Sequence, residues 1–366
     1  MNAYADALCV HLARQASLCA AYTVDTVYFG GGTPSLMGQN RLARIWNAVT
    51  ANYHLSPDAE ITLEANPDSA GEWLGDLYAA GFNRISLGMQ SARNRELREI
   101  GRIHTCAGVQ AAVETIRRAG FENLSLDLIY GLPGQTMDSW ENSLRAALDL
   151  GPEHLSCYGL KLEAGTPLYE RRKTLSFPDA DQQADFYLSA VETLDRYGYR
   201  QYEISNFARP DRESRHNLKY WTLGEYLGFG PGAHSDFGGV RYAYARDLQG
   251  YIDGVQSGFS APSCVTKETD CPVYAEWTAI PPAERVREWI MLGLRTIYGL
   301  DLTAITPNAE GDRQYFDLDF SRCEKFFRQC ERAGYLRREE GRIFLTPKGF
   351  LLSNPIIGEI LELLFT

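Results

Sequence analysis

The chain has 366 residues, of which 45% are hydrophobic and 23% are charged, a composition typical of a soluble globular protein with a sizeable core. Its 36 basic and 47 acidic residues leave a formal charge of −11, which argues against nucleic acid or an anionic membrane as the main partner. Residues 3–21 are interrupted by Asp6, His11 and Arg14, so they predict an amphipathic helix rather than a signal peptide. No stretch is typical of a transmembrane span, and we expect a cytoplasmic protein.

The eight cysteines are expected to be reduced thiols, because disulfides are rare in cytoplasmic proteins. No two of them are separated by two or three residues, so the sequence shows no local ligand set for zinc or for an iron–sulfur cluster. Cys323 and Cys330 lie seven residues apart on a predicted helix and share one of its faces. We expect them to pack in the core rather than to bind a metal.

Strand-like and helix-like segments alternate through the first two thirds of the chain. Strands are predicted at residues 24–29, 60–65, 84–89, 124–129, 154–160 and 200–205. Helices are predicted at 107–119 and at 137–150, where Thr136 is suited to cap the helix. The alternation implies an α/β fold with parallel strands, in a complete or partial barrel or an open sheet. The carboxyl ends of the strands are then the place to look for chemistry.

Three glycines, Gly30, Gly31 and Gly32, directly follow the first predicted strand and leave its backbone bare. The segment lacks the Lys and Ser or Thr of a phosphate loop and does not match the dinucleotide fingerprint. Pro34 stiffens the loop that follows. Taken alone, the run fits a structural turn and a ligand-binding loop equally well.

Polar residues also end the next strands. Glu64 ends the second strand, Gln90 follows the third, and Asp127 lies within the otherwise apolar fourth. A buried carboxylate is costly without a partner, so Glu64 and Asp127 each suggest a ligand hydroxyl or amine, or an internal arginine. The alternative is a set of satisfied core polar groups; together with the glycine run, the set favours a small-molecule site.

The chain changes character after residue 255. Residues 1–255 form the predicted first domain, and residues 256–282, rich in Pro, Thr and Ser, predict a linker or irregular segment. Residues 283–366 contain two predicted helices, at 285–295 and 320–333, and a hairpin that turns at residues 339–341. This order suggests a small winged-helix-like α+β domain, and the acidic chain favours packing or protein contact over DNA binding there.

Several sequence words resemble those of radical S-adenosylmethionine (radical SAM) enzymes of the oxygen-independent coproporphyrinogen oxidase group. Five words occur in the same order as in that group: residues 28–35 (YFGGGTPS), 63–67 (LEANP), 86–91 (SLGMQS), 101–105 (GRIHT) and 126–136 (LDLIYGLPGQT). Two further words, 216–221 (HNLKYW) and 228–235 (GFGPGAHS), resemble the heme-chaperone branch of the group. The resemblance runs from about Tyr4 to the C-terminus.

The resemblance implies a partial (β/α) barrel of the TIM type, S-adenosylmethionine as cofactor and heme as ligand. It implies that the methionine part of S-adenosylmethionine meets the glycine loop, that acidic residues hold its polar groups, and that an arginine fork suits its carboxylate. The implied cofactor residues are Gly31, Gly32, Thr33, Glu64, Gln90, Arg102 and Asp127, with Gly159 and His234 on the adenine side.

The HNLKYW word has two interpretations. By resemblance, His216 is an axial ligand for heme iron, Tyr220 and Trp221 offer flat aromatic surface to the porphyrin, and Asn217 belongs to the same heme site. The structural alternative is a helix start, in which Asn217 caps the helix and the aromatic side chains bury against the barrel.

The chain departs from the family pattern in one large respect. Members carry a first strand followed by Cys-x3-Cys-x2-Cys, whose thiolates hold a 4Fe–4S cluster, and this sequence contains no such motif. We therefore expect a barrel without its first strand, no metal ligands in this chain, no catalytic residues and no radical chemistry. We also expect a misplaced start or a truncation rather than natural loss, because the later words survive.

The resemblance favours a heme chaperone that binds heme and passes it to acceptor proteins, respiratory ones among them. The alternatives are an oxygen-independent coproporphyrinogen III dehydrogenase and a remnant that only binds its ligands. The expected partners are heme and heme-accepting proteins, with transient contact to membrane proteins and none to nucleic acid.

Overall fold

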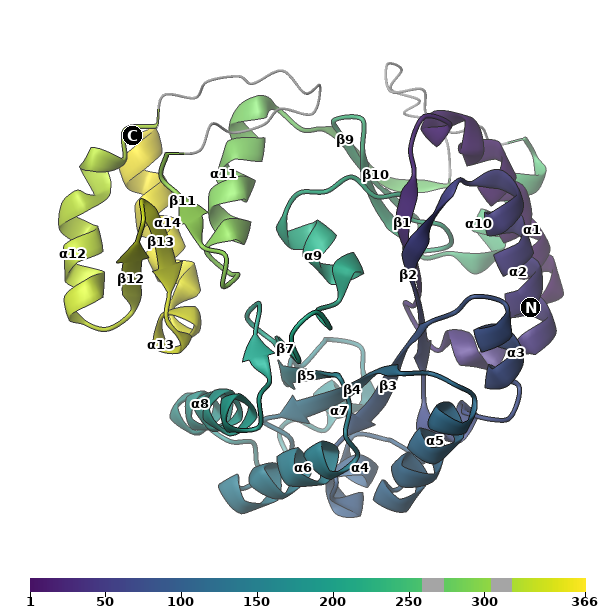
Figure 1. Cartoon of the computed structure of the whole chain (residues 1–366), viewed down its shortest axis with the longest axis horizontal. Helices are drawn as coiled ribbons and strands as arrows, with labels where there is room; N and C mark the ends of the chain where they lie inside the picture. Colours follow the sequence, from purple (N-terminus) through teal and green to yellow (C-terminus); the bar gives the residue numbers. More distant parts are fainter. Residues whose placement is uncertain (259–272, 304–317) are drawn as a thin grey trace. The chain divides into compact units, whose positions relative to one another are not determined.

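The computed structural model describes residues 1–258, 273–303 and 318–366, and it divides into two compact units (Figure 1). Unit one comprises Met1–Glu60, Arg215–Gly293 and Thr303–Asp319, and unit two comprises Ile61–Ser214, Leu294–Leu302 and Phe320–Thr366. Within the described ranges, every helix is too short or too polar to cross a bilayer.

The largest sheet has seven strands in the order β1-β2-β3-β4-β5-β7-β6. Strands β2 to β5 pair in parallel, each with the next along the chain. The α/β class with a mainly parallel sheet is therefore confirmed. The bounds are β1 Val24–Phe29, β2 Leu55–Ala65, β3 Arg84–Gln90, β4 Asn123–Tyr130, β5 His154–Gly159, β6 Arg200–Gln201 and β7 Asn206–Ala208.

The sixth predicted strand is wrong as a single parallel strand. Residues 200–205 form only the short β6, after which the chain turns and returns as β7, antiparallel to both β5 and β6. The turn is held by the buried Glu203, whose carboxylate accepts a hydrogen bond from Ser205 N at 3.1 Å and another from the Asn206 amide. A buried acid that needs local donors thus replaces the regular ladder that the sequence pattern predicts.

Helices α5, α6 and α8 flank one side of strands β3 to β5 in unit two (Figure 1). Their N-termini are capped by Thr105, Thr136 and Asp179, each of which accepts a hydrogen bond from a backbone N–H in the first turn. The cap predicted at Thr136 is therefore confirmed. The helices of this segment are η3 Pro67–Ser69, α3 Leu74–Ala79, α4 Asn94–Glu99, α5 Cys106–Arg118, α6 Met137–Asp149, α7 Pro167–Glu170 and α8 Ala180–Arg196.

Unit one adds a three-stranded antiparallel sheet in the order β10-β9-β8. The linker predicted at residues 256–282 is partly wrong, because Tyr274–Ala279 is strand β10 of this sheet and pairs with β9. Residues 259–272 of that segment lie outside the described residues. Aromatic packing explains the strand, because the ring of Tyr274 stacks on Tyr244 at 5.3 Å. The remaining elements are α1 Asn2–Gln15, η1 Ala16–Cys19, η2 Pro34–Met37, α2 Gln39–Asn52, α9 Arg215–Trp221, β8 His234–Phe237, β9 Val240–Tyr244, α10 Leu248–Gln256 and α11 Pro282–Gly293.

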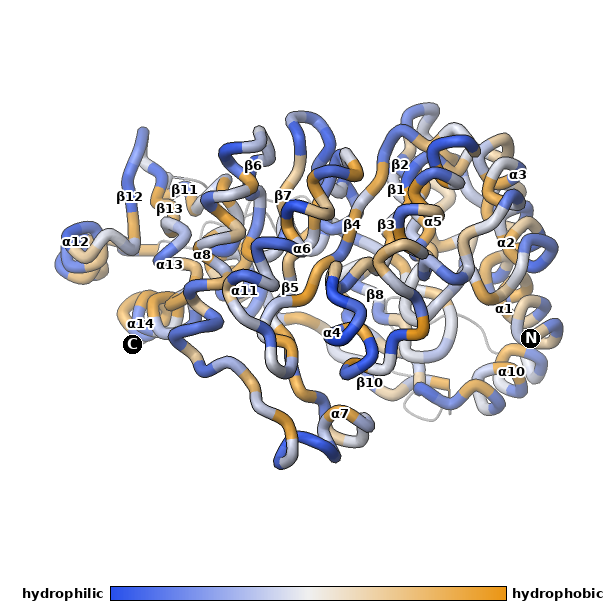
Figure 2. Tube along the Cα trace, turned by 90° about the horizontal axis from the view of Figure 1, so that it is seen from below, coloured by the Kyte–Doolittle hydropathy of each residue, from blue (hydrophilic) through white to orange (hydrophobic). Residues whose placement is uncertain are grey.

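The C-terminal segment is a small α+β assembly, as predicted. Its sheet has the order β11-β13-β12, and β12 and β13 form the predicted hairpin. Cys323 and Cys330 are buried, which confirms their core placement. Figure 2 shows α14 mainly in orange, in keeping with its buried isoleucines, whereas the charged α4 is mainly blue. The elements are β11 Leu300–Asp301, η4 Phe320–Cys323, α12 Glu324–Arg332, β12 Leu336–Glu339, β13 Arg342–Leu345, α13 Pro347–Leu351 and α14 Ser353–Phe365.

Candidate functional site

Helix α9, which carries the HNLKYW word, begins at a carboxylate of its own unit. The buried Glu60 side chain accepts a hydrogen bond from Arg215 N at its Oε2 atom and from His216 N at its Oε1 atom, both at 3.0 Å. A charged acceptor at the positive end of a helix satisfies two backbone donors that otherwise lack helical partners. Glu60 therefore fixes where α9 starts, and Asn217 lies inside the helix rather than at its cap.

The imidazole of His216 is held on both ring nitrogens. Its Nδ1 atom lies 2.9 Å from Thr26 Oγ1, and its Nε2 atom lies 2.8 Å from the Tyr220 hydroxyl. The ring of Tyr28 stacks on the imidazole with centroids 4.9 Å apart and an angle of 19° between the planes. These three contacts leave His216 with a defined ring orientation in a half-buried setting.

The rest of α9 is tied to unit one by charge and by aromatic packing. Lys219 Nζ lies 2.7 Å from Asp25 Oδ1 on β1, and the Tyr220 ring meets Tyr226 edge to face at 4.7 Å. Tyr220 is 40% exposed, while Asn217 and Trp221 are half-buried. The helix thus presents aromatic surface that is not fully covered, which the burial alternative for this word did not predict.

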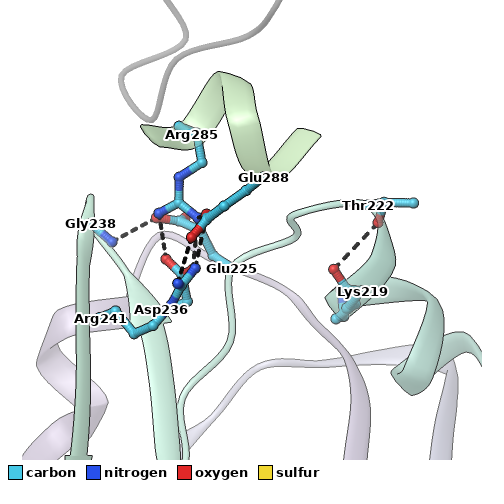
Figure 3. A network of polar contacts seen from close by, with 8 residues as sticks. All are labelled: Lys219, Thr222, Glu225, Asp236, Gly238, Arg241, Arg285 and Glu288. Carbon is cyan, nitrogen blue, oxygen red and sulfur yellow. Dashed lines mark hydrogen bonds and ion pairs between the residues drawn. The ribbon is translucent and has the colours of Figure 1, made fainter. Parts of the chain in front are cut away.

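A polar network joins Asp236 and Arg241 to Arg285 and Glu288 (Figure 3). The backbone of Tyr226 bridges to Asp236 on β8, and the Asp236 carboxylate accepts two hydrogen bonds from Arg285 on α11, both at 2.7 Å. Arg241 bonds both Asp236 and Glu288 at 2.6 Å. Burial raises the pKa of Asp236, but the hydrogen bonds from the two arginines outweigh it and leave that pKa below its usual range.

The glycine loop after β1 has open space where side chains would otherwise stand. Gly31 has a φ of +85°, a conformation that favours glycine, and a Cβ atom at Gly31 or Gly32 would meet nothing within 4 Å. Thr33 is half-buried at the start of η2. The glycine at position 32 is therefore not demanded by neighbouring protein atoms or by its φ, which favours the ligand-binding interpretation of the run.

A polar cluster follows strands β2 and β3 in unit two. Arg102 donates a hydrogen bond to Asn66 Oδ1 at 3.2 Å, and a Cβ atom at Gly88 would lie 2.7 Å from Gln90 Nε2 and 3.4 Å from Asn66 Oδ1. Gln90 has a φ of +64°, which is strained for a residue with a side chain. Strain of this kind is typical of functional sites. Glu64 lies on β2, two residues before Asn66, and is in register with Ser86 of β3.

Asp127 is held by serines of its own sheet. Ser86 Oγ lies 3.0 Å from Asp127 Oδ2, and Ser125 Oγ lies 3.3 Å from Asp127 Oδ1. Burial raises the pKa of this carboxyl, and hydrogen bonds from Ser156 and Ser86 oppose the rise. Protein donors therefore satisfy part of the carboxylate, and the alternative of a satisfied core acid has structural support for Asp127.

The sequence analysis did not identify a buried series of hydrogen bonds that starts at Ser125, two residues before Asp127. Ser125 Oγ also lies 2.8 Å from His154 Nδ1, His154 Nε2 lies 2.8 Å from the Tyr202 hydroxyl, and that hydroxyl accepts a hydrogen bond from Ser214 N at 3.3 Å. Burial holds the pKa of His154 well below its usual value. The period-two polar pattern of Ser125 and Asp127 was the available signal, because alternate residues of a strand face the same side.

A row of unpartnered polar atoms crosses the same sheet. Thr62 Oγ1, Arg84 Nε and Asn123 Oδ1 are buried without a hydrogen-bond partner, and the three residues are register neighbours on β2, β3 and β4. Arg84 is only 2% exposed. Buried polar atoms without partners are rare in folded proteins, and this row lies where β3 and β4 begin, at the end of β3 opposite to Gln90.

The two remaining predicted cofactor residues have structural surroundings of their own. A Cβ atom at Gly159 would lie 3.1 Å from the Tyr130 hydroxyl, so aromatic packing alone disfavours a larger residue there. His234 is exposed at the start of β8, and its carbonyl oxygen would lie 2.1 Å from a Cβ atom at Gly228. The GFGPGAHS word is thus a tight structural loop as well as a family word.

The chain is similar to known proteins in sequence. Residues 6–147 match the Radical SAM superfamily, and residues 280–352 match the HemN C-terminal domain. The heme chaperone HemW of Bacillus subtilis is 34% identical over 343 residues, which are 92% of this chain and 86% of that protein. The chain belongs to the HemW family.

A second HemW relative, the heme chaperone of Synechocystis sp., is 34% identical over 373 residues, covering 98% of this chain and 87% of that protein. Among solved structures, coproporphyrinogen III oxidase (HemN) of Escherichia coli aligns over 98% of this chain and 82% of its own, with a TM-score of 0.79 and 24% identity. The match shows that this HemW-family chain has the fold of that radical SAM enzyme, which confirms the predicted fold class.

The residues of this HemW-family chain do not fit a 4Fe–4S cluster. The sequence has no Cys-x3-Cys-x2-Cys motif, and across the described ranges no three His, Cys, Asp or Glu side chains converge as a metal site. The strained Gln90 and the guanidinium of Arg102 place polar groups at the carboxyl ends of β2 and β3, whereas Arg84 and Asn123 are the first residues of β3 and β4.

Proposed function

We propose that this chain is a heme chaperone that binds heme at helix α9 and transfers it to acceptor proteins. The observation that carries the proposal is the fixed imidazole of His216, between Thr26, Tyr28 and Tyr220, on a helix whose start is set by Glu60. Relatives with 34% identity along most of the chain are named heme chaperones, which supports the same function.

The chemistry of heme suits these side chains. A neutral imidazole is a common axial ligand of heme iron, and flat aromatic rings pack against the porphyrin face. We propose His216 as the iron ligand, Tyr220 and Trp221 as porphyrin contacts, and Asn217 as a polar neighbour of the same site. The partly exposed Tyr220 ring offers surface for this contact.

S-adenosylmethionine is a second proposed ligand. The residues proposed to bind it are given for unit two and then for unit one. In unit two they are Glu64, Gln90, Arg102, Asp127 and Gly159, and in unit one they are Gly31, Gly32, Thr33 and His234. When bound, this molecule supplies a sulfonium centre and a carboxylate. Arg102 is suited to the carboxylate, because guanidinium donors form a fork that matches its two oxygens. No step of the proposed function depends on a cluster.

The alternative activity, coproporphyrinogen III dehydrogenase, has support from the shared fold with HemN and from the match of residues 280–352 to the HemN C-terminal domain. Radical chemistry in that reaction class requires cluster ligands, which this sequence does not contain. The chaperone function requires an iron ligand and an accessible aromatic surface, and His216 and the partly exposed Tyr220 ring are the proposed groups on α9.

Heme titration of the purified full chain tests the proposal. The wild type is expected to shift the Soret band with a saturable one-to-one endpoint, and His216→Ala is expected to lose that shift. His54→Ala is the matched control, because His54 is an exposed histidine of the same unit. An unchanged Soret shift in His216→Ala would contradict heme binding at α9.

Transfer is tested by mixing the heme-loaded chain with apomyoglobin. The chaperone function predicts that the Soret spectrum converts to that of the holo acceptor at a rate that depends on acceptor concentration. A rate independent of the acceptor would indicate simple dissociation and would contradict active handover.

A further inference from the structure

The starting observation is that both nitrogens of the proposed iron ligand are already engaged. Nδ1 of His216 lies 2.9 Å from Thr26 Oγ1, and Nε2 lies 2.8 Å from the Tyr220 hydroxyl. A neutral imidazole has one N–H and one lone pair, and iron binds at the lone pair. Iron therefore reaches His216 only after one of the two hydroxyl groups has left its nitrogen.

The two hydroxyl groups differ in their freedom to leave. Thr26 is only 8% exposed and lies within strand β1, so its hydroxyl moves little. Tyr220 is 40% exposed and lies in the last turn of α9. Rotation of an exposed tyrosine side chain leaves the backbone unchanged and occurs on fast timescales. Tyr220 is therefore the partner that gives way.

The helix itself stays in place when Tyr220 moves. Glu60 holds the first two N–H groups of α9, and the ion pair between Lys219 and Asp25 holds the helix against β1. Tyr226 lies against the Tyr220 ring, and its backbone bridge to Asp236 ties it to the arginine network of Figure 3. These contacts confine the change to one side chain.

We propose that the Tyr220 hydroxyl is a displaceable cover on Nε2 of His216, and that Thr26 is a positioning residue that accepts a hydrogen bond from Nδ1–H. In this arrangement Nδ1–H donates to Thr26 Oγ1, and the Tyr220 O–H donates to the Nε2 lone pair. Such a partner on the second nitrogen selects the tautomer whose Nε2 can bind a metal. The inference rests on the proposed heme site at His216.

The cover has a consequence for a chaperone. Binding of heme breaks the hydrogen bond between Tyr220 and His216, and release of heme restores it. The restored bond lowers the affinity for heme, so it favours release to an acceptor. A protein that stores heme permanently gains nothing from such a competitor, whereas a protein that hands heme on does.

The decisive variant is Tyr220→Phe, which keeps the ring and removes the hydroxyl. Heme affinity, measured by Soret titration, is expected to rise by roughly three- to tenfold, the typical worth of one hydrogen bond. Transfer to apomyoglobin is expected to slow by a similar factor. Tyr226→Phe is the matched control, because it removes a neighbouring hydroxyl that does not bond His216, and it should change neither quantity.

Thr26→Val gives the opposite sign, because the isosteric side chain loses the acceptor that selects the tautomer. Its heme affinity should fall by roughly tenfold, the lower end of outer-shell effects at metal sites, and Thr26→Ser should restore it. Thermal unfolding of each variant within a few degrees of the wild type confirms that the fold is intact. The ferric low-spin signal in electron paramagnetic resonance should remain that of a nitrogen ligand in Tyr220→Phe.

The outcomes separate the cover from the heme site. If His216→Ala leaves the Soret shift intact, the heme site fails and the cover fails with it. If His216→Ala abolishes the shift while Tyr220→Phe binds heme no tighter than wild type, the heme site stands and the cover is overturned. If Tyr220→Phe abolishes binding, the phenol itself is the iron ligand, and the cover is likewise overturned.

Discussion

The pH dependence of stability should contain a signal from Glu203, the buried acid in the turn between β6 and β7. Burial raises the pKa of Glu203 from 4.5 to about 7, and hydrogen bonds from Ser205 and Asn206 only partly oppose the rise. In the unfolded chain the same side chain loses its proton near pH 4.5. Unfolding therefore releases a proton between these two values, and the folded state loses stability as the pH rises from about 4.5 to about 7.

The size of the effect follows from the difference between the two pKa values. A difference from 4.5 to about 7 corresponds to about 3 kcal/mol of unfolding free energy, which is present below pH 4.5 and absent above pH 7. Glu203→Gln removes the titration and keeps a side-chain acceptor for Ser205 N. The variant should gain stability relative to the wild type as the pH rises, by up to about 3 kcal/mol at pH 8.

The assay is urea unfolding of the wild type and of Glu203→Gln at pH 5, 6, 7 and 8. Subtracting the two curves cancels the titration of every other group, including His11, whose buried imidazole has its pKa lowered to about 3. Glu192→Gln, on the exposed surface of α8, is the control and should run parallel to the wild type. A constant difference between wild type and Glu203→Gln across this range would refute the reasoning.

Two further predictions concern stability. A Cβ atom at Gly228 would lie 2.1 Å from a backbone oxygen of β8, so Gly228→Ala should lower the free energy of unfolding by roughly 3 kcal/mol. A Cβ atom at Gly32 meets no atom within 4 Å, so Gly32→Ala should change that free energy by less than about 1 kcal/mol. Equal losses in thermal unfolding would contradict the close-approach argument. Asp236→Asn removes one of the two carboxylates that Arg285 and Arg241 share, the other being Glu288, and should cost roughly 2–3 kcal/mol at low salt. A variant as stable as the wild type in urea would show that the network contributes little.

The parallel strands were predictable because the residues that favour a buried strand are visible in the local sequence. Val24–Phe29 was predicted to the residue, and β3 was predicted to within one residue, since β-branched, aromatic and other apolar residues run between clear turn signals. The helix cap at Thr136 was predictable for the same reason, because it depends only on residues within one turn. Short-range patterns therefore carried most of the fold.

The misses depend on contacts that are distant in sequence. Strand β10 pairs with β9, where Tyr274 stacks on Tyr244, and β7 pairs antiparallel with β5, a strand from an earlier part of the chain. Local capping rules offered Asn217 as the cap of α9 in the structural alternative to a heme site. A carboxylate more than 150 residues away, on Glu60, takes that role instead. Local propensity has no information about such partners.

The sequence by itself determined the α/β class, the family words and the type of chemistry to expect from glycines, acids and an HNxxYW motif. Only the tertiary structure decided how those groups are used: it gave Asp127 serine donors, linked His154 to Tyr202, and placed both nitrogens of His216 against hydroxyl groups. The physical reason is that backbone pattern and propensity act within a few residues. Hydrogen-bond partners and burial, which set the reactivity of a side chain, come from whichever strand or helix the fold brings alongside.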